Sequence, residues 1–138
     1  MERVYTTPLL DKLGVKPGSR VAILGVEDDD FRAQVATRTD DVTDGRPKPD
    51  TDLVFLAADS IEELMRIGEL RRSLRPNGAI WVISRKGKAA TLRDTDVIDA
   101  AKASGLVDNK VASFSATHTA ARLVIPLALR GEAARRGR

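Results

Sequence analysis

The chain has 138 residues, 42% of them hydrophobic, and a formal net charge of +3 at pH 7. This length and composition favour one globular domain and argue against disorder of the whole chain. The absence of cysteine excludes disulfides, thiolate metal sites and a cysteine nucleophile. No apolar run approaches the roughly 20 residues of a membrane-spanning helix, and the first residues contain no signal-peptide core. We therefore expect a soluble, cytoplasmic protein that makes no membrane contact.

The charge is unevenly distributed along the chain. Residues 1–129 are neutral overall, because Glu132 and the arginines at 130, 135, 136 and 138 account for the net charge. Residues 27–52 contain nine acidic and four basic side chains, whereas residues 66–93 contain eight basic and one acidic. This polarity is suited to steering an anionic ligand or an acidic partner, although a set of solvated surfaces produces the same pattern.

The first half of the chain predicts two helices and two strands. Thr7-Pro8 is typical of a helix start and Gly14 of its end. A continuous apolar run favours a strand over 20–25 that is covered on both faces. The remaining expectations are a turn over 16–19, a helix over 28–37, a short edge strand over 39–43 and a loop over 44–50.

The second half repeats the alternation of strands and helices. Ser60 and Glu63 form a capping box, which predicts a helix that continues to about residue 74. The other expected elements are a strand over 52–58, a turn over 75–78, a strand over 79–84, a loop over 85–88, a helix over 94–104 and antiparallel strands over 106–115 and 120–127. Residues 1–127 would form a single domain, and residues 128–138 a flexible basic tail.

Alternating strands and helices predict an α/β fold with a mostly parallel sheet. The loops after the first, third and fourth strands expected in this sheet would then lie together at its carboxyl edge, near the switch point where ligands bind in such folds. These loops are 26–30, 59–60 and 85–88.

Two strings and the terminal strand pair resemble class I S-adenosylmethionine (SAM)-dependent methyltransferases. The strings are KPGSRVAILG and LRRSLRPNGAIWVISRKG, and the resemblance extends over residues 16–127. It implies a three-layer Rossmann-like sandwich with five to six strands, the last of them antiparallel. A complete methyltransferase has one more strand–helix unit between Thr43 and Asp52, so the resemblance implies a reduced form of that fold.

The chain resembles more closely a small bacterial family known only as a domain of unknown function. Residues 7–9, 12–21 and the heptapeptide Gly105 to Val111 are similar to that family's motifs. Its members usually have an aromatic residue near the position of His118. This resemblance implies the fold and brings no established activity.

A cofactor site at the carboxyl edge would involve the residues that follow the first and third strands. These candidates are Gly25, Glu27, Asp28, Asp59 and Ser60. A cofactor loop of this type needs glycines for close backbone approach, and here Gly25 stands alone before an acidic run that would repel phosphate. The amino group of SAM is cationic, so the acids do not exclude that ligand. The alternatives are a degenerate site without cofactor and, for Ser60, a purely structural helix cap.

Three further groups of residues have alternative interpretations. Arg85, Lys86 and Lys88 would either bind an anion or form a solvated loop. His118, the only histidine, cannot form a typical zinc site alone, and its sequence context predicts an exposed turn, so we expect no metal. Asp108, Asn109 and Lys110 are polar within an expected strand, which indicates specific hydrogen bonding or an edge that contacts a partner.

Three functions follow from these observations. The first is a non-catalytic methyltransferase-like domain without cofactor that acts through protein or small-ligand contacts, with an unknown partner or as a homodimer. The second is a small transferase that uses SAM or a nucleotide. The third, nucleic-acid binding through the arginine-rich tail, has the weakest support, because the tail lacks an aromatic platform.

Overall fold

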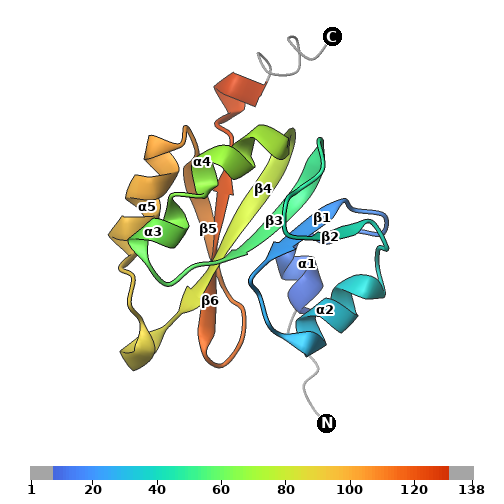
Figure 1. The fold of residues 1–138 in the computed structure, drawn as a ribbon, viewed down its shortest axis with the longest axis horizontal. Coiled ribbons are helices and arrows are strands. Elements are labelled where there is room, and N and C mark those ends of the chain that lie inside the picture. Colours follow the sequence, from blue (N-terminus) through green and yellow to red (C-terminus); the bar gives the residue numbers. More distant parts are fainter. Residues whose placement is uncertain (1–7, 131–138) are drawn as a thin grey trace.

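The computed structural model describes residues 8–130, and within this range the chain forms one six-stranded sheet (Figure 1). The strand order is β2-β1-β3-β4-β6-β5. β1, β2, β3 and β4 are mutually parallel, and β6 runs antiparallel to both of its neighbours. The strands are β1 (Val21–Leu24), β2 (Val42–Asp44), β3 (Thr51–Ala57), β4 (Leu74–Arg85), β5 (Val107–Ser113) and β6 (His118–Val124). The expected mostly parallel sheet with an antiparallel last strand is confirmed.

Helices cover both faces of the sheet. Helices α1 (Leu9–Leu13) and α2 (Asp29–Ala36) pack on one face, and α3 (Ile61–Leu64), α4 (Ile67–Leu70) and α5 (Asp94–Ala103) pack on the other. The 3₁₀ turns η1 (Arg71–Ser73) and η2 (Gly87–Ala89) precede and follow β4. The central strands are buried on both sides, as their continuous apolar sequences predict. This arrangement is the three-layer sandwich.

Each face has its own hydrophobic core. On the α1 side, Trp81 is fully buried and its indole N–H donates a hydrogen bond to the Leu13 carbonyl at 3.0 Å. Phe31 contacts both Phe55 and Phe114 edge-on, with ring centroids 5.0 Å apart in each pair. These contacts fix α1 and α2 on the strands that lead to the carboxyl edge.

Two expectations for the β3–β4 connection were wrong in detail. The helix expected from residue 60 to about 74 is divided into α3, α4 and η1, because the bond from the Arg66 amide to the Glu63 carbonyl is of the tighter 3₁₀ kind. The turn expected over 75–78 is a bulge within β4, since Leu74 pairs with Thr51 and Ala79 with Leu53. Gly78 is required there, because a Cβ would lie 2.8 Å from the Asp52 carbonyl oxygen.

The connection between β2 and β3 is short. Residues 45–50 form no helix or strand, so the strand–helix unit of a complete methyltransferase is missing, as expected. β6 ends at Val124 rather than at the expected Leu127, and residues 127–130 are helical. The rest of the predicted basic tail, residues 131–138, lies outside the described residues.

Within residues 8–130, no helix combines the length and the apolar composition needed to cross a bilayer.

Candidate functional site

A cavity of about 520 Å³ opens at the carboxyl edge of the sheet, where β1, β3 and β4 end and β6 begins. Its volume is within the range of small-molecule sites. The lining residues come from three strand ends and one hairpin: Gly25, Val26, Glu27, Asp28, Asp29, Ala57, Asp59, Ile83, Arg85, Phe114, Ser115, Thr117 and His118. The structure therefore places Gly25, Glu27, Asp28, Asp59 and Arg85 in one site, where the sequence predicted them.

The loop after β1 is fixed by glycine and by a helix cap. Gly25 has φ of +76°, a left-handed conformation that side-chain-bearing residues rarely adopt. Asp28 is the N-cap of α2, and its carboxylate accepts a hydrogen bond from the Phe31 amide at 2.9 Å. Arg32 donates from Nε to the Val26 carbonyl at 2.8 Å. One acid of the run thus has a structural role, whereas Glu27 and Asp29 are exposed beside the cavity.

Asp59 and Arg85 bind each other at the opposite wall. The Asp59 carboxylate accepts a hydrogen bond from the Arg85 amide at 2.9 Å, and its second oxygen lies 3.8 Å from the Arg85 Nε. Both side chains are substantially exposed, so the ion pair contributes little to stability. It does direct the positive charge of Arg85 towards a carboxylate and away from an incoming anion.

Ser60 does not line the cavity. Its hydroxyl accepts a hydrogen bond from the Glu63 amide at 3.1 Å, and the Glu63 carboxylate accepts one from the Asp59 amide at 2.8 Å. These are the contacts of a helix cap. The structural interpretation of Ser60 accounts for its position.

Lys86 and Lys88 are likewise outside the cavity lining. The Lys86 ammonium donates to the Ser113 hydroxyl at 3.0 Å, on the outer hairpin, and Lys88 lies in η2. Of the three basic residues predicted to bind an anion, the structure brings only Arg85 into the site.

The β5–β6 hairpin contributes residues to the cavity that were not predicted from the sequence. His118 is the first residue of β6, pairs with Arg85 of β4 and is half-buried, so the expectation of an exposed turn residue was wrong. Its Nδ1 lies 2.7 Å from the Thr117 hydroxyl. A signal was available: an antiparallel last strand beside β4 must begin at the edge where β4 ends.

The cavity is acidic. It is lined by four carboxylates and one guanidinium group, and that guanidinium is adjacent to a carboxylate. Such a lining attracts cations and repels phosphate groups. Among the described residues, no group of three or more His, Asp or Glu side chains has an arrangement that could hold a metal ion.

The Asp108-Asn109-Lys110 segment lies on the outer edge strand, away from this cavity. Asp108 pairs with Leu123 and Lys110 with Arg122, so Asn109 is the extra residue of a bulge. The Lys110 ammonium donates to the Lys12 carbonyl at 3.1 Å. The hydrogen bond to α1 gives Lys110 a structural role, and the bulge at Asn109 makes the edge strand β5 irregular.

The architecture is that of class I methyltransferases, in a reduced Rossmann-like form. A SAM-dependent methyltransferase from Aquifex aeolicus superposes with a TM-score of 0.66 at 15% identity, covering 86% of this chain and 88% of that one. A putative type 11 methyltransferase from Sulfolobus solfataricus gives 0.62 at 16%, covering 85% and 89%. A SAM-dependent methyltransferase from Bacteroides fragilis, in complex with S-adenosyl-L-homocysteine, gives 0.57 at 12%, covering 89% and 79%. At these identities the similarity establishes the fold alone.

Residues 10–127 match the family described as "Protein of unknown function (DUF3052)". The match covers most of the chain, so the protein belongs to this family, as its motifs indicated. A search of curated proteins gives no match.

Proposed function

We propose that this protein is a non-catalytic ligand-binding domain whose acidic cavity takes a cationic small molecule, with SAM as the first candidate. The observation that supports this most directly is the excess of carboxylates around a ligand-sized cavity at the switch edge of the sheet. SAM has a cationic sulfonium and a cationic ammonium group. Several of the structural neighbours are SAM-dependent by name.

The carboxylates available to hold SAM are those of Glu27 and Asp29, with the Gly25 backbone allowing close approach. When bound to a methyltransferase, SAM supplies an electrophilic methyl group. Two of the four carboxylates that line the cavity already have partners within the protein, because Asp28 caps α2 and Asp59 binds Arg85. This commitment of side chains to structure supports a binding role, in which the occupied state would be recognised by a protein partner or a second copy.

Isothermal calorimetry with SAM tests the binding. Glu27 is exposed beside the cavity and makes no side-chain hydrogen bond to another described residue, so Glu27→Gln should leave the fold intact. Loss of one charged contact should weaken SAM binding about tenfold. Asp108→Asn, which removes the same charge outside this cavity, should change the affinity less than twofold. Absence of saturable SAM binding to the wild-type protein would refute the proposal.

A SAM-dependent transferase is the second candidate, and the position of His118 favours it. The imidazole lines the cavity, and its Nε2 makes no hydrogen bond to another residue within 8–130, so it is available as a general base. Incubation with methyl-labelled SAM and a bacterial metabolite extract distinguishes the two candidates. Transfer of label that His118→Gln abolishes would establish the transferase and overturn the non-catalytic role.

A further inference from the structure

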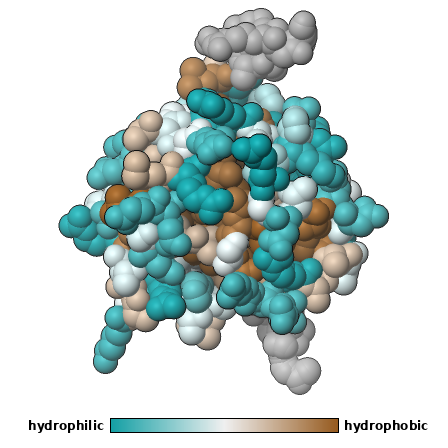
Figure 2. Space-filling view, viewed as in Figure 1, coloured by the Kyte–Doolittle hydropathy of each residue, from teal (hydrophilic) through white to brown (hydrophobic). Residues whose placement is uncertain are grey.

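A second cavity, of about 510 Å³, lies beside the sheet face that α4 covers, away from the carboxyl-edge site. Its walls are the β2–β3 loop, with Arg46, Pro47 and Pro49, and the segment from the N-cap of α4 to η1, with Arg66, Glu69 and Arg72. We call this cavity the arginine pocket. Figure 2 shows this side of the molecule, where hydrophobic surface in the middle is flanked by hydrophilic side chains. The arginine pocket shares no lining residue with the acidic cavity.

The lining of the arginine pocket is strongly cationic. It contains three guanidinium groups and one carboxylate, that of Glu69. The Glu69 carboxylate lies 4.0 Å from Arg46, and both side chains are highly exposed, so this ion pair neutralises little of the charge. The guanidinium groups of Arg66 and Arg72 form no hydrogen bond or ion pair with other residues of the described range. Their donors are therefore available to a ligand.

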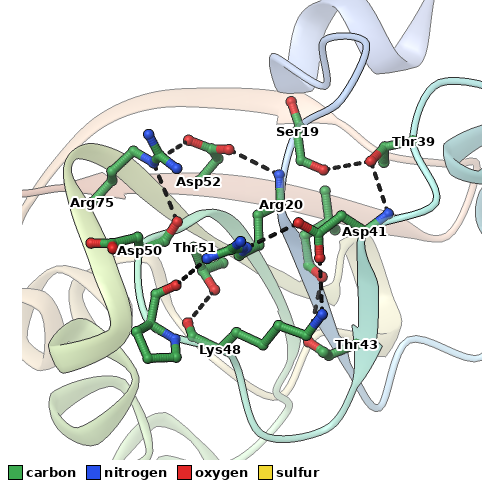
Figure 3. Close-up of polar contacts among 12 residues, drawn as sticks. Ser19, Arg20, Thr39, Asp41, Thr43, Lys48, Asp50, Thr51, Asp52 and Arg75 are labelled. Carbon is green, nitrogen blue, oxygen red and sulfur yellow. Dashed lines mark hydrogen bonds and ion pairs between the residues drawn. The ribbon is translucent and has the colours of Figure 1, made fainter.

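The loop wall of the arginine pocket is fixed by a polar network beneath it (Figure 3). The Arg20 guanidinium donates to the Pro49 carbonyl at 2.6 Å and to the Asp41 carboxylate at 3.0 Å. Lys48 donates to the same carboxylate at 3.2 Å, and the Thr51 hydroxyl donates to the Lys48 carbonyl at 2.6 Å. A loop held at this many points loses little entropy when a ligand binds.

We propose that the arginine pocket binds a phosphoryl group of a small molecule. Guanidinium groups match the geometry of phosphate oxygens and form paired, charge-assisted hydrogen bonds to them. The cavity volume is that of a small-molecule site, which favours a compact ligand over an acidic protein segment. The protein then has two sites of opposite charge, the acidic cavity for a cation and the arginine pocket for a phosphoryl group. The second assignment is independent of the first.

Calorimetry with inorganic pyrophosphate and with ADP tests this assignment. Both compounds should bind the wild-type protein saturably, and Arg66→Gln combined with Arg72→Gln should weaken each at least tenfold. Tighter binding of ADP would assign a nucleotide, and equal binding a simple phosphate group. The matched control is Lys86→Gln combined with Lys88→Gln, which removes the same charge elsewhere and should change the affinities less than twofold.

Three results would overturn the assignment. The first is no saturable binding of either compound, and the second is an equal loss in both double variants, which would indicate general electrostatic attraction. The third is binding of a polyglutamate peptide, lost in the Arg66/Arg72 variant, while pyrophosphate fails to bind. Urea unfolding verifies that the double variants are folded. SAM affinity should be unchanged in the Arg66/Arg72 variant, so that failure of this assignment stays distinct from failure of the carboxyl-edge site.

Discussion

Asp41 shows how one side chain can order a whole loop. Its carboxylate accepts hydrogen bonds from Arg20 and Lys48. These contacts, of which the hydrogen bond from Arg20 has the largest effect, hold the pKa of Asp41 below its usual range. The same hydrogen bond raises the pKa of Arg20. Arg20 in turn holds the Pro49 carbonyl. The charge of Asp41 therefore contributes to the position of residues 45–50, which form one wall of the arginine pocket.

We expect Asp41→Asn to destabilise the protein in a pH-dependent manner. A carboxyl group whose pKa is lower in the folded than in the unfolded state stabilises the fold above its unfolded pKa. That contribution is lost as the pH falls through the lowered folded pKa of Asp41. Urea midpoints of wild type and variant should therefore differ at pH 7 and converge towards pH 3. Asp40→Asn, at an exposed neighbouring acid, is the control. A difference that stays constant with pH would contradict the charge-based explanation.

At the scale of elements, α3, the first helix after β3, begins at a cap with a testable role. α3 contains only four residues, and Ser60 satisfies the Glu63 amide in its first turn. We expect Ser60→Ala to lower the free energy of unfolding by about 1 kcal/mol. Because Ser60 does not line the acidic cavity, SAM affinity should stay within twofold of wild type. Urea unfolding and calorimetry on the same samples measure both effects, and a stable variant with weakened SAM binding would assign Ser60 to the site instead.

The elements themselves were largely predictable, because local sequence determines them. The continuous apolar runs of β1, β3 and β4 predicted buried strands, and Gly14 ended the first helix as expected. The bulge at 75–78 was not predicted, because a Pro-Asn-Gly sequence has the same composition in a turn as in a bulge. What distinguishes the two is the close approach of the Asp52 carbonyl to Gly78, a contact between strands.

The candidate site was only partly predictable, because it depends on which strands are neighbours. Loops that follow parallel strands lie at the same edge of the sheet. The sequence therefore predicted that Gly25, Asp59 and Arg85 lie close together, as they do in the cavity. His118 enters the same cavity through the pairing of β6 with β4. The expected antiparallel last strand predicts this position only once β4 is known to be its neighbour. The arginine pocket needs two segments about 20 residues apart to face each other. Charge patterning indicated the basic segment but not its partner loop.

At the scale of the whole molecule, one sheet separates two hydrophobic cores. The core on the α1 side contains Leu10 and Trp81, and the core on the other side contains Leu64. Both cores share the same strands, since neighbouring residues of β1, β3 and β4 point into opposite cores. Loss of either core exposes the faces of the same sheet. The described part of the chain should therefore unfold as one cooperative unit, in keeping with the expected single domain.

Two matched variants test this cooperativity. Leu10 and Leu64 are 3% and 1% exposed, so Leu10→Ala and Leu64→Ala should each lower the free energy of unfolding by about 2–5 kcal/mol. Trp81 is the only tryptophan, so its fluorescence reports on the α1-side core, while far-UV circular dichroism reports on all elements. In both variants the urea midpoints from the two probes should coincide. If Leu64→Ala shifts the dichroism midpoint and leaves the Trp81 midpoint at the wild-type value, the two sides of the sheet unfold separately and the single-unit description is wrong.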